Sequence, residues 1–210
     1  MRKIILNLAI TLDGFIEGPN AEMDWLVRDD ETDFGDILNE ILSDKDIIFY
    51  GRISYDKWGN SQPDEKASKK IKDAYNLMHS KQKLVFSKTK KEDDTNAIFI
   101  NSNIEEKVLE IKKQPGKNIW LYGGASLATT FLNLDLIDEY RLVVHPVILG
   151  KGKPLFQNIE DGHKLILADV KTYKSGVILV TYKADRKKIV EQTLAKETKR
   201  VRIKSIAKTP

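Results

Sequence analysis

The chain of 210 residues has no cysteine and only three histidines. The absence of cysteine excludes disulfide bonds, catalytic thiolates and cysteine-ligated zinc. His79, His145 and His163 are scattered along the chain without the short spacing of metal ligands, so we predict no metal site. Proteins without disulfides are typical of reducing compartments, and we expect this protein to be cytoplasmic.

Long hydrophobic runs are also missing. No apolar stretch reaches the roughly 20 residues that a membrane-spanning helix requires. The first ten residues, MRKIILNLAI, begin like a signal peptide, but Asn7 interrupts the apolar stretch and Asp13 closes it. No small-residue cleavage site follows. We therefore interpret residues 2–10 as a buried strand and expect no membrane partner.

Charge is distributed unevenly along the chain. Residues 186–210 carry nine basic and two acidic side chains, a net charge of +7, whereas the whole chain carries +4, so residues 1–185 carry −3. We predict a folded domain over residues 1–185 and a basic extension over 186–210. The extension is interpreted as a solvated or partner-docked segment, as a nucleic-acid contact, or as a segment that packs on a second subunit. No aromatic side chain follows Tyr182 to stack on bases, which argues against nucleic acid.

The period of the apolar residues predicts the order of helices and strands. Strands are expected at residues 2–10, 46–50, 83–86, 97–100 and 118–122, and helices at 32–42, 64–80, 104–112 and 123–132. After Asp135 the sequence is rich in strand patterns, with Lys174-Ser175-Gly176 as a hairpin turn. This order predicts an α/β fold with a largely parallel central sheet and antiparallel strands added at one edge.

A buried strand runs directly into a helix in the segment Ile119-Trp120-Leu121-Tyr122-Gly123-Gly124-Ala125-Ser126-Leu127. Glycines allow a tight turn and let a bulky anion approach the backbone. The unpaired N–H groups and the dipole of the new helix then stabilise phosphate. The motif is shorter than a full dinucleotide-binding fingerprint, and a tight turn without a ligand is the alternative interpretation.

Two other predicted strands end in groups that attract anions. Arg52 and Ser54 follow one strand and its Gly51, while Ser87 and Lys88 follow another. An arginine binds phosphate through two parallel hydrogen bonds, and ligands of open α/β sheets lie at the carboxyl ends of the strands. Each cation alone is also explained as a solvated surface side chain. Together, three such strand ends indicate one long polyphosphate ligand along a shared edge.

The order of these motifs resembles the dihydrofolate reductase-like superfamily. The resemblance rests on Thr11-Leu12-Asp13-Gly14, Gly51-Arg52-x-Ser54-Tyr55, Ser87-Lys88-Thr89 and Gly123-Gly124-x-x-Leu127. The later Leu134-Asp135-Leu136-Ile137-Asp138-Glu139 and Pro146-Val147-Ile148-Leu149-Gly150-Lys151-Gly152-x-x-Leu155-Phe156 resemble the branch named for the C-terminal reductase domain of the riboflavin-biosynthesis deaminase-reductase. The resemblance covers about residues 2–184. It implies a three-layer α/β/α fold with a mixed central sheet, NADPH as hydride donor, and a homodimer.

The resemblance also implies which residues hold the cofactor. Gly51, Arg52 and Ser54 are implied at its phosphates, and Ser87 and Lys88 at the adenosine 2′-phosphate. The pyrophosphate loop comprises Tyr122, Gly123, Gly124, Ala125, Ser126 and Leu127, and the residues that flank the nicotinamide are Ala9 and Ile16. Charge-assisted hydrogen bonds of about 1.5–3 kcal/mol each from Arg52 and Lys88 predict a preference for NADPH over NADH of roughly tenfold or more apiece.

Four residues are predicted on the substrate side: Thr11, Asp13, Trp25 and Asp33. Asp13 is the expected catalytic carboxylate because it lies in the loop beside the expected nicotinamide position, although a plain Asp-Gly turn explains it equally. Trp25 resembles the tryptophan that borders the folate pocket, or is a core aromatic. Asp33 lies near the position where dihydrofolate reductases place a substrate-binding carboxylate, but the register brings Gly35 closest, which disfavours folate itself.

The sequence therefore predicts an NADPH-dependent reductase that transfers hydride to a small heterocyclic, carbonyl or imine substrate. It resembles 5-amino-6-(5-phosphoribosylamino)uracil reductase. The chain lacks the cysteines of a zinc-dependent deaminase, so any role in riboflavin biosynthesis is confined to the reductase step. A non-catalytic NADPH-binding protein and a nucleic-acid-binding protein that uses the basic extension are the alternatives.

Overall fold

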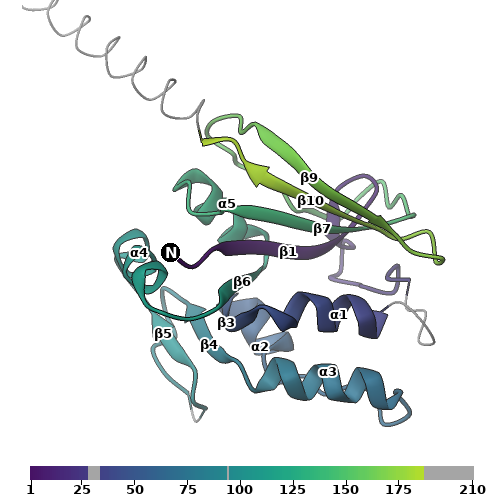
Figure 1. The fold of residues 1–210 in the computed structure, drawn as a ribbon, viewed down its shortest axis with the longest axis horizontal. Helices are drawn as coiled ribbons and strands as arrows, with labels where there is room; N and C mark the ends of the chain where they lie inside the picture. The colour runs from purple at the N-terminus through teal and green to yellow at the C-terminus, as the bar shows by residue number, and fades with distance from the viewer. Residues whose placement is uncertain (28–33, 94, 187–210) are drawn as a thin grey trace, which may run out of the picture.

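An eight-stranded mixed sheet forms the centre of the computed structural model, which describes residues 1–27, 34–93 and 95–186 (Figure 1). From one edge to the other the strands are β5 (Ile98–Ile100), β4 (Gln82–Phe86), β3 (Lys45–Gly51), β6 (Asn118–Gly123), β1 (Ile4–Thr11), β7 (Glu139–His145), β10 (Ile178–Ala184) and β9 (Leu165–Thr172). The strands from β5 to β7 are parallel, whereas β10 is antiparallel to both β7 and β9. The predicted mixed sheet is confirmed.

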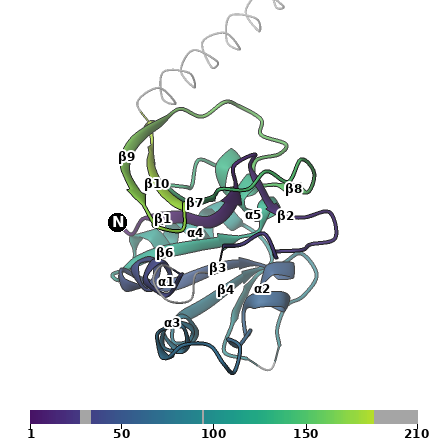
Figure 2. The ribbon, with the colours of Figure 1, turned by 90° about the vertical axis from the view of Figure 1, so that its right-hand side faces the viewer.

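Helices cover both faces of this sheet because successive strand residues face opposite sides. They are α1 (Phe34–Ser43), α2 (Arg52–Trp58), α3 (Lys69–His79), α4 (Ile104–Lys113) and α5 (Ala125–Asn133). In β3, Ile47 and Phe49 share a core with α4 and α5, whereas Ile48 and Tyr50 share a core with the other three helices. Figure 2 shows the strands in succession from β9 to β4. The three-layer arrangement is confirmed.

The structure corrects three details of the predicted elements. A short helix, α2, follows Gly51 directly, in a stretch where no helix was predicted. The predicted polar helix at 64–80 begins only at Lys69, where the Ser68 hydroxyl accepts a backbone N–H, and it buries Ile71 and two further apolar residues. The strand-rich end contains β7, but β7 pairs parallel to β1, so in the eight-stranded sheet the antiparallel pairs are β7–β10 and β10–β9.

Two smaller strands complete the described part of the chain. β2 (Phe15–Glu17) pairs with β8 (Lys153–Pro154) in a separate antiparallel sheet, and this pairing draws the loop after β1 toward the loop after β7. The predicted turn at residues 174–176 joins β9 to β10, with Gly176 in the left-handed region at φ +83°. Within the described ranges, none of the helices has the length and apolar character to cross a bilayer.

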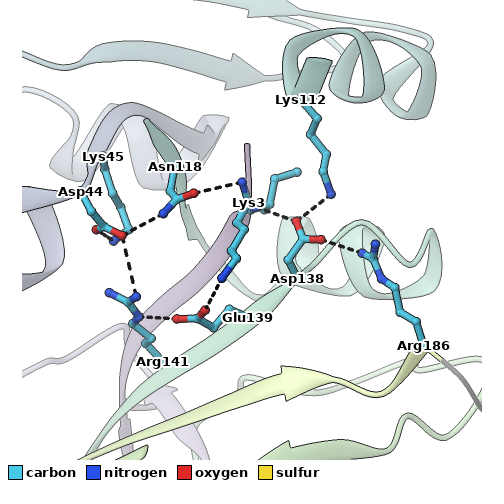
Figure 3. Close-up of polar contacts among 10 residues, drawn as sticks. Lys3, Asp44, Lys45, Lys112, Asn118, Asp138, Glu139, Arg141 and Arg186 are labelled. Carbon is cyan, nitrogen blue, oxygen red and sulfur yellow. Dashed lines mark hydrogen bonds and ion pairs between the residues drawn. The ribbon is translucent and has the colours of Figure 1, made fainter. Parts of the chain in front are cut away.

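Charged side chains gather at the amino ends of the parallel strands (Figure 3). The Lys112 ammonium lies 2.6 Å from the carboxylate of Asp138, and the same carboxylate accepts the backbone N–H of Ile4 at 2.8 Å. The fully buried Lys45 donates to the carboxylate of Asp44 at 2.5 Å. Burial lowers the pKa of Lys45. At this end of the sheet the buried charges are paired.

Candidate cofactor and substrate site

The carboxyl ends of the parallel strands lie along one edge of the sheet. Gly51, the last residue of β3, pairs with Phe86 at the end of β4, and Tyr50 pairs with Gly123 at the end of β6. The three strand ends that the sequence singled out are therefore immediate neighbours. Arg52, Ser87 and Gly124 follow directly from them, which confirms the predicted shared edge.

Glycines let the backbones at this edge approach closely. A Cβ built on Gly51 would lie 3.4 Å from the carbonyl oxygen of Gly123 and 3.6 Å from the Cβ of Leu127. A Cβ on Gly124 would lie 3.1 Å from the Ser54 hydroxyl oxygen. Gly123 has φ +91°, a conformation that favours glycine. The two loops thus approach each other through glycine backbone, with the Ser54 hydroxyl beside Gly124, and together form one cradle.

The start of α5 borders this cradle. Gly124 precedes the helix in an extended conformation and, as a glycine, offers no side-chain cap to the first helical N–H groups. Such groups bind anions well, because the helix dipole adds to their hydrogen bonds. Ala125 and Leu127 are buried in the core, so among the first helical residues only the Ser126 side chain is exposed. The cradle fits a phosphate held by backbone groups.

Cations flank the cradle at the end of β4. The Arg52 guanidinium lies 2.8 Å from the carboxylate of Asp56, and the Lys90 ammonium lies 3.2 Å from the same carboxylate. The hydrogen bond to Asp56 raises the pKa of Lys90. Lys88, in the same loop as Lys90, is exposed. Lys90, two residues after Lys88, is a third cation near this edge that was not predicted.

Ser87 plays a local part in the same loop. Its buried hydroxyl oxygen accepts the backbone N–H groups of Thr89 at 3.2 Å and Lys90 at 2.8 Å. The side-chain amide of Asn101 donates to the Ser87 carbonyl oxygen at 2.9 Å. These contacts shape the loop that presents Lys88 and Lys90. The assignment of Ser87 to the 2′-phosphate stays a prediction.

A cavity of about 180 Å³ lies between the sheet and the layer formed by α1, α2 and α3. Its walls are mainly apolar, from residues such as Leu38, Ile41, Trp120 and Val143. Five residues that the sequence assigned to the cofactor also line it: Ala9, Ile16, Ser54, Tyr122 and Gly124. The cavity therefore continues from the glycine cradle, and its volume is similar to that of a protein cavity known to hold one benzene ring, about 150 Å³.

Two buried polar side chains in this cavity were not predicted as site residues. Asn7 is 1% exposed, and neither its Oδ1 nor its Nδ2 has a hydrogen-bond partner among the described residues. His145 is 4% exposed and accepts the backbone N–H of Val27 at Nδ1, at 3.1 Å. Desolvation lowers the pKa of His145 to about 4, so the ring is neutral at pH 7 and carries its proton on Nε2.

The sequence held a signal for each of these two residues. Asn7 is the polar residue that interrupts the apolar first strand, and His145 ends β7 just as Thr11 ends β1. His145 was considered above only as a metal ligand. Trp25, a predicted substrate residue, packs edge-on against His145 with ring centroids 5.4 Å apart. Its Nε1 is buried and has no hydrogen-bond partner in the described ranges.

The predicted catalytic carboxylate of Asp13 is engaged in loop contacts. It accepts the hydroxyl of Thr11 at 2.6 Å and the backbone N–H groups of Leu149 and Gly150 at 3.1 and 2.7 Å. The hydrogen bond from Thr11 is the main cause that lowers the pKa of Asp13. The Thr11 hydroxyl in turn accepts the N–H of Phe15 at 3.0 Å. Asp13 thus fastens the loop after β1 to the loop after β7, and Thr11 holds the Asp13 carboxylate within its own loop.

Neither Asp13 nor Thr11 is among the described residues that line the cavity. Their contacts are those of a turn that also anchors a distant loop, which was the alternative interpretation of Asp13. The proposed catalytic and substrate-binding roles of these residues stay predictions. Asp33 falls outside the described residues, as does the basic extension beyond Arg186.

Comparison with known proteins agrees with this fold. A family model for the RibD C-terminal domain matches residues 2–179. The chain is 52% identical over 181 residues to the uncharacterized protein YyaP of Bacillus subtilis, covering 86% of this chain and 94% of that protein. It is 30% identical over 182 residues to the uncharacterized protein YwjB of the same organism, covering 85% and 96%.

Solved structures share the fold at low sequence identity. A proposed riboflavin biosynthesis protein of Shewanella sp. PV-4 superposes with a TM-score of 0.71 at 21% identity, covering 88% of this chain and 99% of that one. The diaminohydroxyphosphoribosylaminopyrimidine deaminase/5-amino-6-(5-phosphoribosylamino)uracil reductase of Thermotoga maritima gives 0.61 at 14%, covering 87% and 56%. The match of the family model over most of the sequence shows that the chain belongs to the RibD C-terminal domain family.

Proposed function

We propose that this protein is a cytoplasmic NADPH-dependent reductase that transfers hydride to a small heterocyclic, carbonyl or imine substrate. The observation that carries the proposal is the shared edge at which a glycine cradle, three cations and an apolar cavity meet. A phosphorylated dinucleotide needs such a combination, because its phosphates require donors while its reacting ring requires a water-poor pocket.

The residues present fit the cofactor from end to end. Backbone groups of Gly51, Gly123 and Gly124, with the Ser54 hydroxyl, are suited to the phosphates because no Cβ fills the cradle. Arg52 and the lysines after β4 are suited to the 2′-phosphate that distinguishes NADPH from NADH. Bound NADPH supplies the hydride. The mainly apolar cavity walls limit the water around the reacting ring.

The proton for the reduced product is not expected from Asp13. Its lowered pKa keeps the carboxylate ionised at neutral pH, and its oxygens already accept three donors. His145 is neutral and points its Nε2 proton away from the Val27 amide that holds Nδ1. His145 is therefore suited to hold a carbonyl or imine acceptor by donating one hydrogen bond, and solvent then supplies the proton.

Cofactor binding is tested by calorimetric titration with NADPH and NADH. Wild type should prefer NADPH, and Arg52→Ala should weaken NADPH binding roughly tenfold with little effect on NADH. Lys69→Ala is the matched control, because Lys69 also pairs with an aspartate four residues on, at 2.6 Å, but begins α3 and does not line the cavity. Equal affinity of wild type for both cofactors would show that these cations do not read the 2′-phosphate.

Catalysis is tested by following NADPH absorbance with pyrimidine, pterin and small carbonyl compounds. Oxidation of NADPH by one class identifies the substrate chemistry, and 5-amino-6-(5-phosphoribosylamino)uracil belongs in the set because it is the substrate named for the Thermotoga protein. Tight NADPH binding without oxidation by any compound supports the alternative, a non-catalytic NADPH-binding protein.

We further propose that the protein forms a homodimer through β9. This strand ends the sheet, all eight of its residues are exposed, and Leu165, Ile166, Leu167 and Val170 are apolar. An apolar edge strand with unpaired backbone groups favours pairing with a second sheet edge. Sedimentation of wild type as a dimer and of Ile166→Lys as a monomer would support it, whereas a monomeric wild type would refute it.

A further inference from the structure

Asn7 is the least satisfied polar side chain that faces the cavity. Neither of its two amide atoms has a hydrogen-bond partner among the described residues, although the residue is almost fully buried. Burying an amide in this way destabilises a folded protein, and most buried polar groups find partners. The main-chain oxygen of Asn7 does have one, the Trp120 indole N–H at 2.9 Å. The hydrogen-bonding groups of Asn7 that remain without a partner are thus those of its side chain.

Asn7 lines the cavity from the middle of β1, away from the carboxyl end of the strand. Leu6 and Leu8 face the core under α5, so Asn7 and Ala9 face the cavity side of β1. Asn7 lies four residues before Thr11, the last residue of the strand, which corresponds to roughly 13 Å of strand length. Ala9 lies between them, at the position that the resemblance assigns to the nicotinamide.

We infer that Asn7 recognises the substrate by pairing with the adjacent N–H and C=O of a neutral cyclic amide, as found in pyrimidinones and pterins. This inference rests on the proposed reductase function. A carboxamide presents one acceptor beside one donor, and asparagine reads such paired edges on nucleobases. The surrounding walls of Leu38, Ile41 and Val143 suit the two faces of a flat ring. His145, nearer the strand ends, supplies a second neutral donor.

A nicotinamide also carries an amide, so the cofactor is a second source of the same chemistry. The experiment therefore measures two dissociation constants by calorimetry, one for NADPH and one for 6-aminouracil added to the NADP⁺-saturated protein. The variant is Asn7→Leu, which keeps the branched side-chain skeleton and removes both polar atoms. Tyr50→Phe is the matched control, because the Tyr50 hydroxyl is likewise buried and without a partner among the described residues but does not line the cavity.

We expect Asn7→Leu to weaken 6-aminouracil binding at least about tenfold, to leave NADPH binding within twofold, and to melt no lower than wild type. Tyr50→Phe should change neither constant. On the wild type, 1,3-dimethyl-6-aminouracil, which lacks both ring N–H groups, should bind at least about tenfold more weakly than 6-aminouracil. This comparison of ligands does not depend on how well the variant folds.

Each contrary result has a distinct meaning. Undiminished 6-aminouracil binding by Asn7→Leu, or no binding of 6-aminouracil by wild type, overturns the inference. Loss of NADPH affinity with unchanged 6-aminouracil affinity also overturns it, because Asn7 would then read the cofactor amide. If the wild-type protein does not bind NADPH, the proposed function itself is refuted.

Discussion

The two ends of the parallel strands differ in how their polar groups are used. At the amino ends, Lys112, Asp138 and Lys45 are buried or nearly buried and each has charged partners (Figure 3). Toward the carboxyl ends, the cavity-facing side chain of Asn7 has no hydrogen-bond partner in the described ranges, and α5 begins after Gly124, which offers no side-chain cap. A fold gains stability where polar groups are satisfied, and it gains binding capacity where they are not. The same sheet therefore has one end that stabilises the fold and one end that can bind a ligand.

The largest effect that would sharpen this comparison is expected at the amino ends. Asp138→Ala removes the partner of the Lys112 ammonium, which is 4% exposed, and the acceptor of the Ile4 N–H. A buried charge left unpaired lowers stability by about 3–5 kcal/mol. Urea denaturation at pH 7 measures this loss, and NADPH affinity below the unfolding transition should be unchanged.

The control for this variant is Asp73→Ala. It breaks an ion pair with Lys69, whose side chain is 89% exposed, and such surface pairs contribute about 0–1 kcal/mol. If Asp138→Ala lost as little stability as Asp73→Ala, the amino-end cluster would be a set of ordinary surface contacts. If it also lost NADPH affinity, the division between the two ends would be wrong.

The parts of the fold that the sequence predicted are those with long local signals. β3 and β6 carry continuous apolar runs bounded by glycine, and α4 and α5 repeat apolar residues at helical spacing. α2 was missed because it has seven residues and buries only Tyr55, too few for a period to be visible. The glycines and Arg52 of the cradle could also be predicted from the sequence, because each acts through its own backbone or its own charge.

The residues of the deeper site could not be predicted in the same way. The role of Asn7 depends on what its side chain lacks once folded, and that of His145 on a hydrogen bond from Val27, 118 residues away. The anchoring of Asp13 to Leu149 and Gly150 spans more than 130 residues. Such partners are chosen by the tertiary structure, which neither spacing nor composition reveals.

The second effect, intermediate in size, is the pH dependence of stability that His145 causes at the carboxyl end of β7. The His145 ring has a pKa of about 4 in the folded protein, against 6.5 for an exposed histidine, because burial disfavours the charged form. As pH falls from 6.5 toward 4, the unfolded chain binds a proton that the folded chain does not. The free energy of unfolding therefore decreases over this window, by about 2 kcal/mol between pH 6.5 and 5.

The variant that isolates this contribution is His145→Gln, which does not titrate. Its free energy of unfolding should fall by about 2 kcal/mol less than that of wild type between pH 6.5 and 5, in guanidinium titrations at both values. Equal pH dependence of wild type and His145→Gln would mean that water reaches the ring and that this end of the sheet is less dry than its packing indicates.

The smallest expected effect is a change in NADPH affinity, and it tests whether the cations at the carboxyl edge are available to bind a phosphate. The Asp56 carboxylate lies 2.8 Å from Arg52 and 3.2 Å from Lys90, so it competes with any phosphate for both. Asp56→Asn removes that competition and should tighten NADPH binding about threefold at low ionic strength, less in 0.5 M KCl, and leave NADH binding unchanged. Asp73→Asn, from the equivalent pair on α3, should change neither. Weaker NADPH binding by Asp56→Asn would instead show that Asp56 orients the Arg52 guanidinium for the phosphate, and the two ends of the sheet would then both rely on fixed ion pairs.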